Sequence, residues 1–123
     1  MDVALIAVVG VFFLGMGMYG LAAPAALIRP FGIALDRPEA RAEVRAVYGG
    51  FGVAIAGVLA FAALRAEFRT GIVLTVGVAL IGMAFGRVAS ALARDRTAFY
   101  PNWFYFLVEL AVAGVLLLAL MAS

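Results

Sequence analysis

The sequence contains no cysteine, no histidine and no lysine among its 123 residues. Without cysteine, the chain cannot form disulfides, thiolate metal sites or a cysteine nucleophile. Without histidine, it lacks the usual general base near neutral pH and the commonest metal ligand. Without lysine it has no side-chain amine for a Schiff base, and all nine of its cations are arginine. These absences narrow the chemistry, and the sequence predicts no metal, no cofactor and no catalytic residue.

Charge of either sign is also scarce. Charged residues make up 13% of the chain and hydrophobic residues 67%, and the mean hydropathy is +1.18. Soluble domains are about 45–50% apolar and about 25% charged. Because a soluble domain of this length could not cover so much apolar surface, we expect the lipid bilayer to be its solvent. The net charge of +2 is too small and too dispersed to indicate a nucleic-acid partner.

Four apolar stretches are each long enough to cross about 30 Å of hydrocarbon. The first has Asp2 in place of a basic region and is too long for a signal peptide, so we expect it to be retained as a span. Short connections favour helices that are adjacent in sequence and antiparallel. The predicted fold is an all-α integral membrane protein in one domain, residues 1–123. It is an antiparallel bundle of four transmembrane helices over residues 3–28, 38–64, 71–93 and 101–121.

Local signals mark the ends of these helices. Pro24 is expected to kink the last turns of the first helix. Asp36 followed by Glu39 predicts a capping box at the start of the second, and residues 65–70 read as a polar turn. Gly49–Gly50 favours a close helix crossing over a hinge, and Gly82-x-x-x-Gly86 is a second candidate crossing. An aromatic group typical of a membrane interface begins the fourth helix: Phe99, Tyr100, Trp103, Phe104 and Tyr105.

The arginines are distributed unevenly between the two sides of the predicted bundle. Five lie on the side of the first and third connections and two on the opposite side. Because arginine favours the cytoplasmic side, both termini are expected to be periplasmic in a bacterial inner membrane. The five are Arg29, Arg37, Arg41, Arg94 and Arg96, and the two are Arg65 and Arg69.

Four charged residues fall inside the predicted spans. Helix rise places Arg87 about 10 Å, Glu109 about 12 Å, and both Glu43 and Arg45 about 8–10 Å from the same side. A charge at this depth favours the bundle interior and a partner. Arg87 and Glu109 are the preferred pair because their depths match, and Glu43 or Arg45 could extend the network. The predicted ligand-binding residues are Glu43, Arg45, Tyr48, Arg87, Ser90, Asn102, Tyr105 and Glu109.

The segment Glu43 to Gly50 reads E-V-R-A-V-Y-G-G, and Pro30 with Gly32 precedes it. With Arg87 near the end of the third helix and Glu109 in the fourth, this pattern resembles an uncharacterised family of small bacterial four-helix membrane proteins. That family is classed as a domain of unknown function, and it is similar at a distance to the DoxX/DoxD-like group. The resemblance covers most of the chain and implies the fold but no activity.

Three functions remain open. The charged cluster could bind or move a small anion, a lipid or another amphiphile. Alternatively, it could only staple the bundle of a structural or accessory subunit, which packs against a second copy or a partner protein. The third is a lipid or quinone isomerase, with Glu43 or Glu109 as the acid/base group and Arg45 or Arg87 as the stabilising charge.

Overall fold

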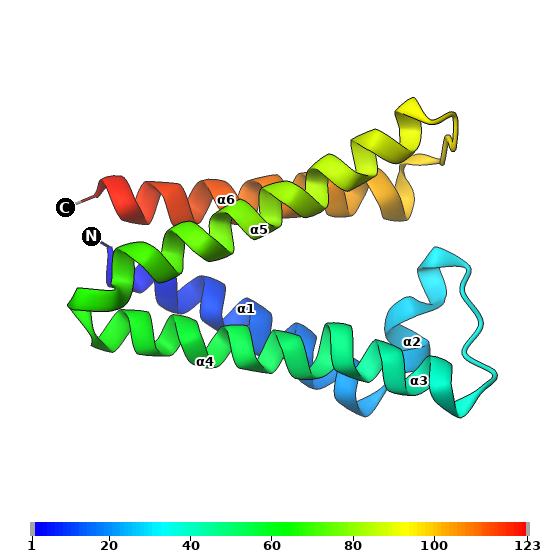
Figure 1. Ribbon diagram of the computed structural model, residues 1–123, viewed down its shortest axis with the longest axis horizontal. Coiled ribbons are helices and arrows are strands. Elements are labelled where there is room, and N and C mark those ends of the chain that lie inside the picture. Colours follow the sequence, from blue (N-terminus) through cyan, green and yellow to red (C-terminus); the bar gives the residue numbers. More distant parts are fainter. Residues whose placement is uncertain (1, 123) are drawn as a thin grey trace.

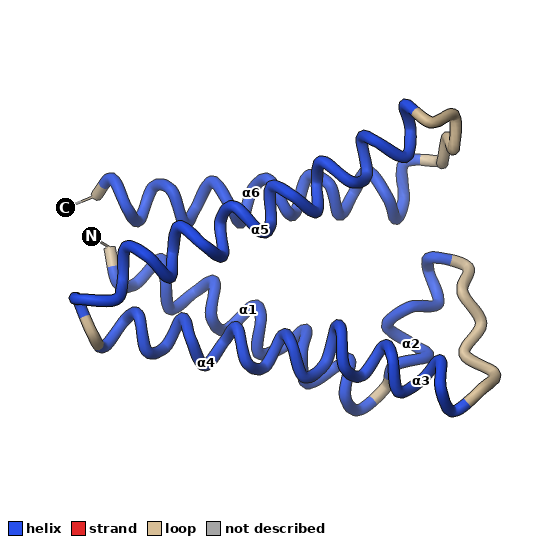
Figure 2. Tube along the Cα trace, in the orientation of Figure 1, coloured by secondary structure: helices blue, strands red, loops and turns tan. Residues whose placement is uncertain are grey.

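A computed structural model describes residues 2–122, and within that range every element is helical (Figure 2). Four helical segments are long and apolar enough to cross a membrane, which confirms the predicted fold class. The segments are Val3–Ala22, Pro38–Leu64, Ala66–Leu92 and Phe99–Met121.

The first span is helix α1, Val3–Ala22, and it begins at a side-chain cap. The Asp2 carboxylate accepts from the backbone N–H groups of Ala4 and Leu5 at 3.0 and 3.3 Å. The helix does not continue to residue 28 as expected. It ends where Ala23 takes φ −140° and ψ 64°, because Pro24 has no N–H and its ring clashes with the preceding turn. Two short elements follow the break, α2 (Pro24–Ile28) and η1 (Arg29–Phe31), and Gly32 ends them at φ 73°.

The second span is one continuous helical run of three elements: α3 (Pro38–Val44), η2 (Arg45–Gly50) and α4 (Phe51–Leu64). Its middle element, η2, is a π-helical turn, a local widening that recurs at functional sites. The predicted capping box is wrong. The N-cap is Arg37, without a side-chain cap, and the Glu39 carboxylate instead pairs with the Arg37 guanidinium at 3.3 Å.

The third span, α5, covers Ala66–Leu92 and begins earlier than the expected residue 71. Only Arg65 is extended, so the predicted turn over 65–70 is mostly helix. The Arg69 side chain explains why so tight a connection is possible. It donates to the carbonyls of Ala62 and Ala63 at 2.8 and 3.0 Å, which would otherwise have no partner at the end of α4. The fourth span consists of η3 (Phe99–Trp103) and α6 (Phe104–Met121).

The spans associate as two pairs, α1 with α4 and α5 with α6 (Figure 1). The pairs meet at the end that holds both termini, where the Asp2 N–H donates to the Ala119 carbonyl at 3.2 Å. Towards the other end the pairs diverge (Figure 1). The main hydrophobic core occupies the end near the termini and is built from Ile6, Val9, Leu59, Ala62, Val73, Val76, Leu80, Ala113, Leu116 and Ala119.

Glycines set the close crossing of α1 with the second span. A Cβ on Gly17 would lie 2.6 Å from the Val53 backbone nitrogen, and one on Gly20 would lie 2.9 Å from the Gly49 nitrogen. Gly49 therefore forms the expected close crossing, whereas Gly50 faces open space apart from an ordinary contact. The Gly82-x-x-x-Gly86 spacing makes no such crossing within residues 2–122: nothing lies within 4 Å of a Cβ built at Gly82 or Gly86.

Candidate functional site

The Arg87 guanidinium on α5 and the Glu109 carboxylate on α6 form a bidentate ion pair. Arg87 Nε donates to Glu109 Oε1 and Arg87 Nη2 donates to Glu109 Oε2, both at 2.9 Å. The Glu109 side chain is 6% exposed and the Arg87 side chain 20%. Two parallel N–H···O bonds fix orientation as well as charge. The pair predicted from matching depths is therefore confirmed.

The local sequence explains why these two side chains face each other. On α5, Val73, Val76, Leu80 and Ala84 form a buried stripe at helical spacing, and Arg87 is its next position. On α6, Glu109 begins the buried stripe that continues through Ala113, Leu116 and Ala119. Both charged groups thus extend a line of core residues toward the divergent end of the bundle.

Asn102 gives the guanidinium a third acceptor. Arg87 Nη1 donates to Asn102 Oδ1 at 3.2 Å, so Asn102 joins the site as expected. A guanidinium carries five N–H groups. One N–H on Nη1 and one on Nη2 have no partner among residues 2–122, and the Asn102 amide N–H₂ has none either. The cluster is therefore rich in free donors, although its two formal charges cancel.

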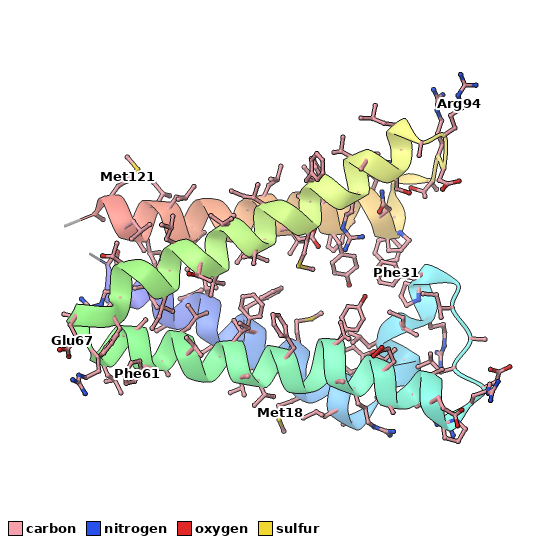
Figure 3. The ribbon with its side chains drawn as sticks, in the orientation of Figure 1. Met18, Phe31, Phe61, Glu67, Arg94 and Met121 are labelled. Atoms are coloured by element: carbon pink, nitrogen blue, oxygen red, sulfur yellow. The ribbon has the colours of Figure 1, made fainter. Side chains whose placement is uncertain are left out.

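Two aromatic rings flank the guanidinium. The Arg87 Cζ atom lies 5.9 Å from the Phe31 ring centroid and 6.0 Å from that of Tyr105, within the range of a cation–π contact. The two rings lie 5.5 Å apart. Figure 3 labels Phe31 at the divergent end, between the two helix pairs. Because Phe31 belongs to η1 and Tyr105 to α6, these rings connect the first helix pair to the second.

Phe31 is the residue that the sequence prediction missed. It was assigned to the connection after the first helix, yet a small cluster holds it in place. Phe31 packs with Met16 and Leu35 against the buried side chains of Leu27, Ile28 and Val44. The signal in the sequence is a single aromatic residue between Pro30 and Gly32, in a stretch otherwise suited to a turn.

Arg45, one of the predicted ligand-binding residues, makes no hydrogen bond or ion pair with Arg87 or Glu109 among the described residues. Its Nε donates to the Leu21 carbonyl at 3.1 Å. The break at Ala23 interrupts the hydrogen-bond ladder at the end of α1, and carbonyls in a last turn need outside donors. Arg45 therefore acts as a cap for α1 in this structure.

Three more predicted residues make no hydrogen bond or ion pair with Arg87 or Glu109. The side chains of Glu43, Tyr48 and Ser90 are exposed and make no hydrogen bond with the other described residues, with Tyr48 41% exposed. Direct contacts thus join Arg87, Asn102, Tyr105 and Glu109, and the place of the other four in a ligand site stays a prediction. No three acidic side chains within residues 2–122 are grouped closely enough to hold a metal ion.

The arrangement limits the chemistry of the site. Both oxygens of Glu109 accept from Arg87 and the side chain is only 6% exposed, so a substrate has little access to the carboxylate for an acid/base role. Without rearrangement, the cluster offers free hydrogen-bond donors that lie beside two aromatic rings. Such a site is suited to holding a polar group rather than to transferring a proton.

The fold and the site define an all-helical protein with four helices long and apolar enough to cross a membrane, two of them joined by a bidentate arginine–glutamate pair. The chain belongs to the family described as "Domain of unknown function (DUF4345)", whose model matches residues 3–120. The expected membership of an uncharacterised family is confirmed, and the distant similarity to the DoxX/DoxD-like group stays a prediction. Neither the curated proteins nor the solved structures contain a match to the chain.

Proposed function

We propose that this protein is a multi-pass protein of a bacterial inner membrane that binds a lipid or similar amphiphile at the Arg87–Asn102–Glu109 cluster. The polar head of the ligand would lie at the cluster, and its chain would lie against apolar helix faces within the bilayer. The ion pair would then be intramembrane, with both termini on the periplasmic side.

One observation carries this proposal. The main core joins the helix pairs near the termini, whereas at the divergent end Phe31 and Tyr105 join them beside the free donors of Arg87 and Asn102 (Figures 1 and 3). Binding sites combine apolar side chains with a few convergent polar groups, and here the polar groups of the cluster lie beside two aromatic rings.

A free small anion fits the site less well than an amphiphile. Glu109 already neutralises Arg87 at 2.9 Å. An added anion would therefore leave an excess negative charge in a medium of low dielectric constant, where unpaired charges are costly. An amphiphile gains affinity from its chain as well, at about 0.8 kcal/mol for each buried CH₂ relative to water.

The second candidate function is a structural or accessory subunit in which the ion pair only staples α5 to α6. The bidentate geometry and the 6% exposure of the Glu109 side chain favour it. Under this alternative the exposed glycines of α5, Gly82 and Gly86, would pack against a second copy or a partner protein.

A charge-free double variant separates the two functions. Replacing a buried ion pair by apolar residues of similar size is often neutral for stability, so Arg87→Met/Glu109→Leu should fold. The matched control is Arg65→Met/Glu67→Leu, which removes the exposed pair at the opposite end. Both variants and the wild type are extracted in a mild detergent and analysed by native mass spectrometry.

If the protein binds an amphiphile, the wild type and the control carry a lipid-sized adduct that the Arg87/Glu109 variant loses, while all three keep similar thermal stability. Equal adducts, or none, on all three proteins would contradict the proposed function. If the Arg87→Met/Glu109→Leu variant folds but no longer forms an oligomer, or no longer co-purifies with a partner protein, the accessory-subunit function is favoured.

A further inference from the structure

We infer that the site selects an uncharged head group with carbonyl or hydroxyl oxygens, such as that of an acylglycerol, over an anionic one. This inference rests on the proposed function and specifies its ligand. It follows from the zero net charge of the Arg87–Glu109 pair and from the fact that the free hydrogen-bonding groups of the cluster are N–H donors.

The charges of the cluster are already satisfied. Arg87 contributes one positive charge and Glu109 one negative charge, joined by two bonds of 2.9 Å. No other ionisable carboxylate or guanidinium within the described residues forms an ion pair with either of them. A charged head group would therefore meet no counter-charge, and it would have to displace Glu109 or Arg87 to find one.

The free groups are donors. Arg87 retains two N–H groups and the Asn102 amide retains its N–H₂, because Asn102 Oδ1 is the atom that accepts from Arg87. Each Glu109 oxygen accepts one bond from Arg87, and the Glu109 side chain is only 6% exposed, so little of the carboxylate is open to a ligand. A head group that offers neutral acceptor oxygens matches this set, since each free donor gains a partner without a change in net charge.

The flanking rings strengthen the same preference. The ring centroids of Phe31 and Tyr105 lie 5.5 Å apart, and both rings lie beside the guanidinium of Arg87, whose side chain is 20% exposed. In such surroundings an uncompensated charge costs more than in bulk water, whereas a neutral hydrogen bond becomes stronger. The rings would also contact the glycerol or ester carbons of the head group.

A series of amphiphiles with one chain and different head groups tests this inference. Monomyristoylglycerol, myristate, myristyl phosphate and myristyltrimethylammonium share a fourteen-carbon chain. Because each buried CH₂ contributes about 0.8 kcal/mol in all four probes, differences in affinity report the head group. Each is titrated into the delipidated wild type in detergent, and its dissociation constant is measured by native mass spectrometry. We expect the acylglycerol to bind at least about tenfold more tightly than either anion, a difference of about 1.4 kcal/mol.

Glu109→Gln provides the decisive comparison, because it keeps a side chain of similar shape and leaves Arg87 without its counter-charge. The order should then reverse, with myristate and myristyl phosphate binding more tightly than the acylglycerol. Glu67→Gln, in the exposed pair with Arg65, should keep the order of the wild type. Asn102→Leu supplies a second variant if Glu109→Gln does not fold. It should weaken acylglycerol binding several-fold and leave myristate binding unchanged.

The outcomes separate the two proposals. If none of the four probes binds the wild type, the proposed function fails. If an anionic probe binds the wild type most tightly and the binding requires Arg87, the function stands and the neutral head group is wrong. If the acylglycerol is preferred but neither Glu109→Gln nor Asn102→Leu changes that preference, the assignment to this cluster is overturned.

Discussion

Arg87 and Glu109 lie 22 residues apart in the chain and meet through two hydrogen bonds of 2.9 Å that join α5 to α6. The Glu109 side chain is almost fully buried and the Arg87 side chain is one-fifth exposed. The pair thus combines a structural contact with a donor surface that other groups can reach. Its contribution to stability and its contribution to binding can be measured separately.

Removing the charge of only one partner should destabilise the protein. Glu109→Gln leaves the Arg87 guanidinium without a counter-charge in a position that is one-fifth exposed. A fully buried unpaired charge typically costs about 3–5 kcal/mol, so we expect a loss near the lower end of that range. The free energy of unfolding in a mixed-micelle denaturation experiment measures this loss. Glu67→Gln is the control: its partner Arg65 is 52% exposed, so the change should stay below about 1 kcal/mol. Equal losses in the two variants would show that the Arg87–Glu109 pair is no stronger than an exposed one.

The ion pair could be predicted from the sequence because helix depth is linear in residue number. Arg87 and Glu109 lie at similar distances from the ends of their spans, and each stands in a regular α-helical segment, α5 and α6. Asn102 and Tyr105 follow from the same face of the fourth helix, since they precede Glu109 at helical spacing.

The role of Arg45 could not be predicted in this way. Its partner is the Leu21 carbonyl, which becomes available only because α1 breaks at Ala23. A proline near the end of a span indicates that some carbonyl will lose its donor, but it does not indicate which distant side chain replaces it. Phe31 was missed for a related reason, because its position depends on how α2 and η1 fold back after the break.

The glycines show the same limit. Gly49 and Gly82 both lie in apolar, glycine-containing helices, and sequence spacing alone favours a crossing at each. Only Gly49 has a neighbouring backbone at crossing distance, because α1 supplies Gly20 there. Whether a small residue marks a crossing therefore depends on the residue opposite, which local spacing does not report.

Substitution of a crossing glycine should separate the α1 and α4 helices. In Gly17→Ala the new Cβ would lie 2.6 Å from the Val53 backbone nitrogen and 2.9 Å from the Gly49 carbonyl oxygen. Backbone atoms cannot rotate away, so we expect a loss of about 1–3 kcal/mol in the free energy of unfolding. Gly57→Ala is the matched control because nothing lies within 4 Å of its Cβ. That variant should be unchanged or up to about 1 kcal/mol more stable, from helix propensity. A stable Gly17→Ala protein would contradict the close crossing.

Replacement of Arg45 should affect stability and leave ligand binding intact. Arg45→Met removes the donor to the Leu21 carbonyl, which lies 3.1 Å from Nε. A hydrogen bond from a charged donor contributes about 1.5–3 kcal/mol, but Arg45 is exposed and screened by solvent, so the expected loss is about 1 kcal/mol or less. Thermal unfolding and acylglycerol titration of the same sample measure the two effects. If Arg45→Met instead weakens acylglycerol binding and leaves stability unchanged, Arg45 is part of the ligand-binding site.

The orientation of the protein in the membrane can be tested directly, because the sequence has no cysteine and any introduced thiol is unique. Glu67 lies at the end that holds the termini, and Arg94 marks the opposite end (Figure 3). The arginine distribution predicts that the end with Arg94 is cytoplasmic. A membrane-impermeant maleimide added to intact cells should therefore label Glu67→Cys, and it should label Thr97→Cys, in the connection after Arg94, only after permeabilisation. The reverse pattern would place the Arg87–Glu109 cluster nearer the periplasmic side, since Arg87 lies in the half of α5 that is nearer to Arg94. Its ligand would then have to enter from the outer leaflet instead of the inner one.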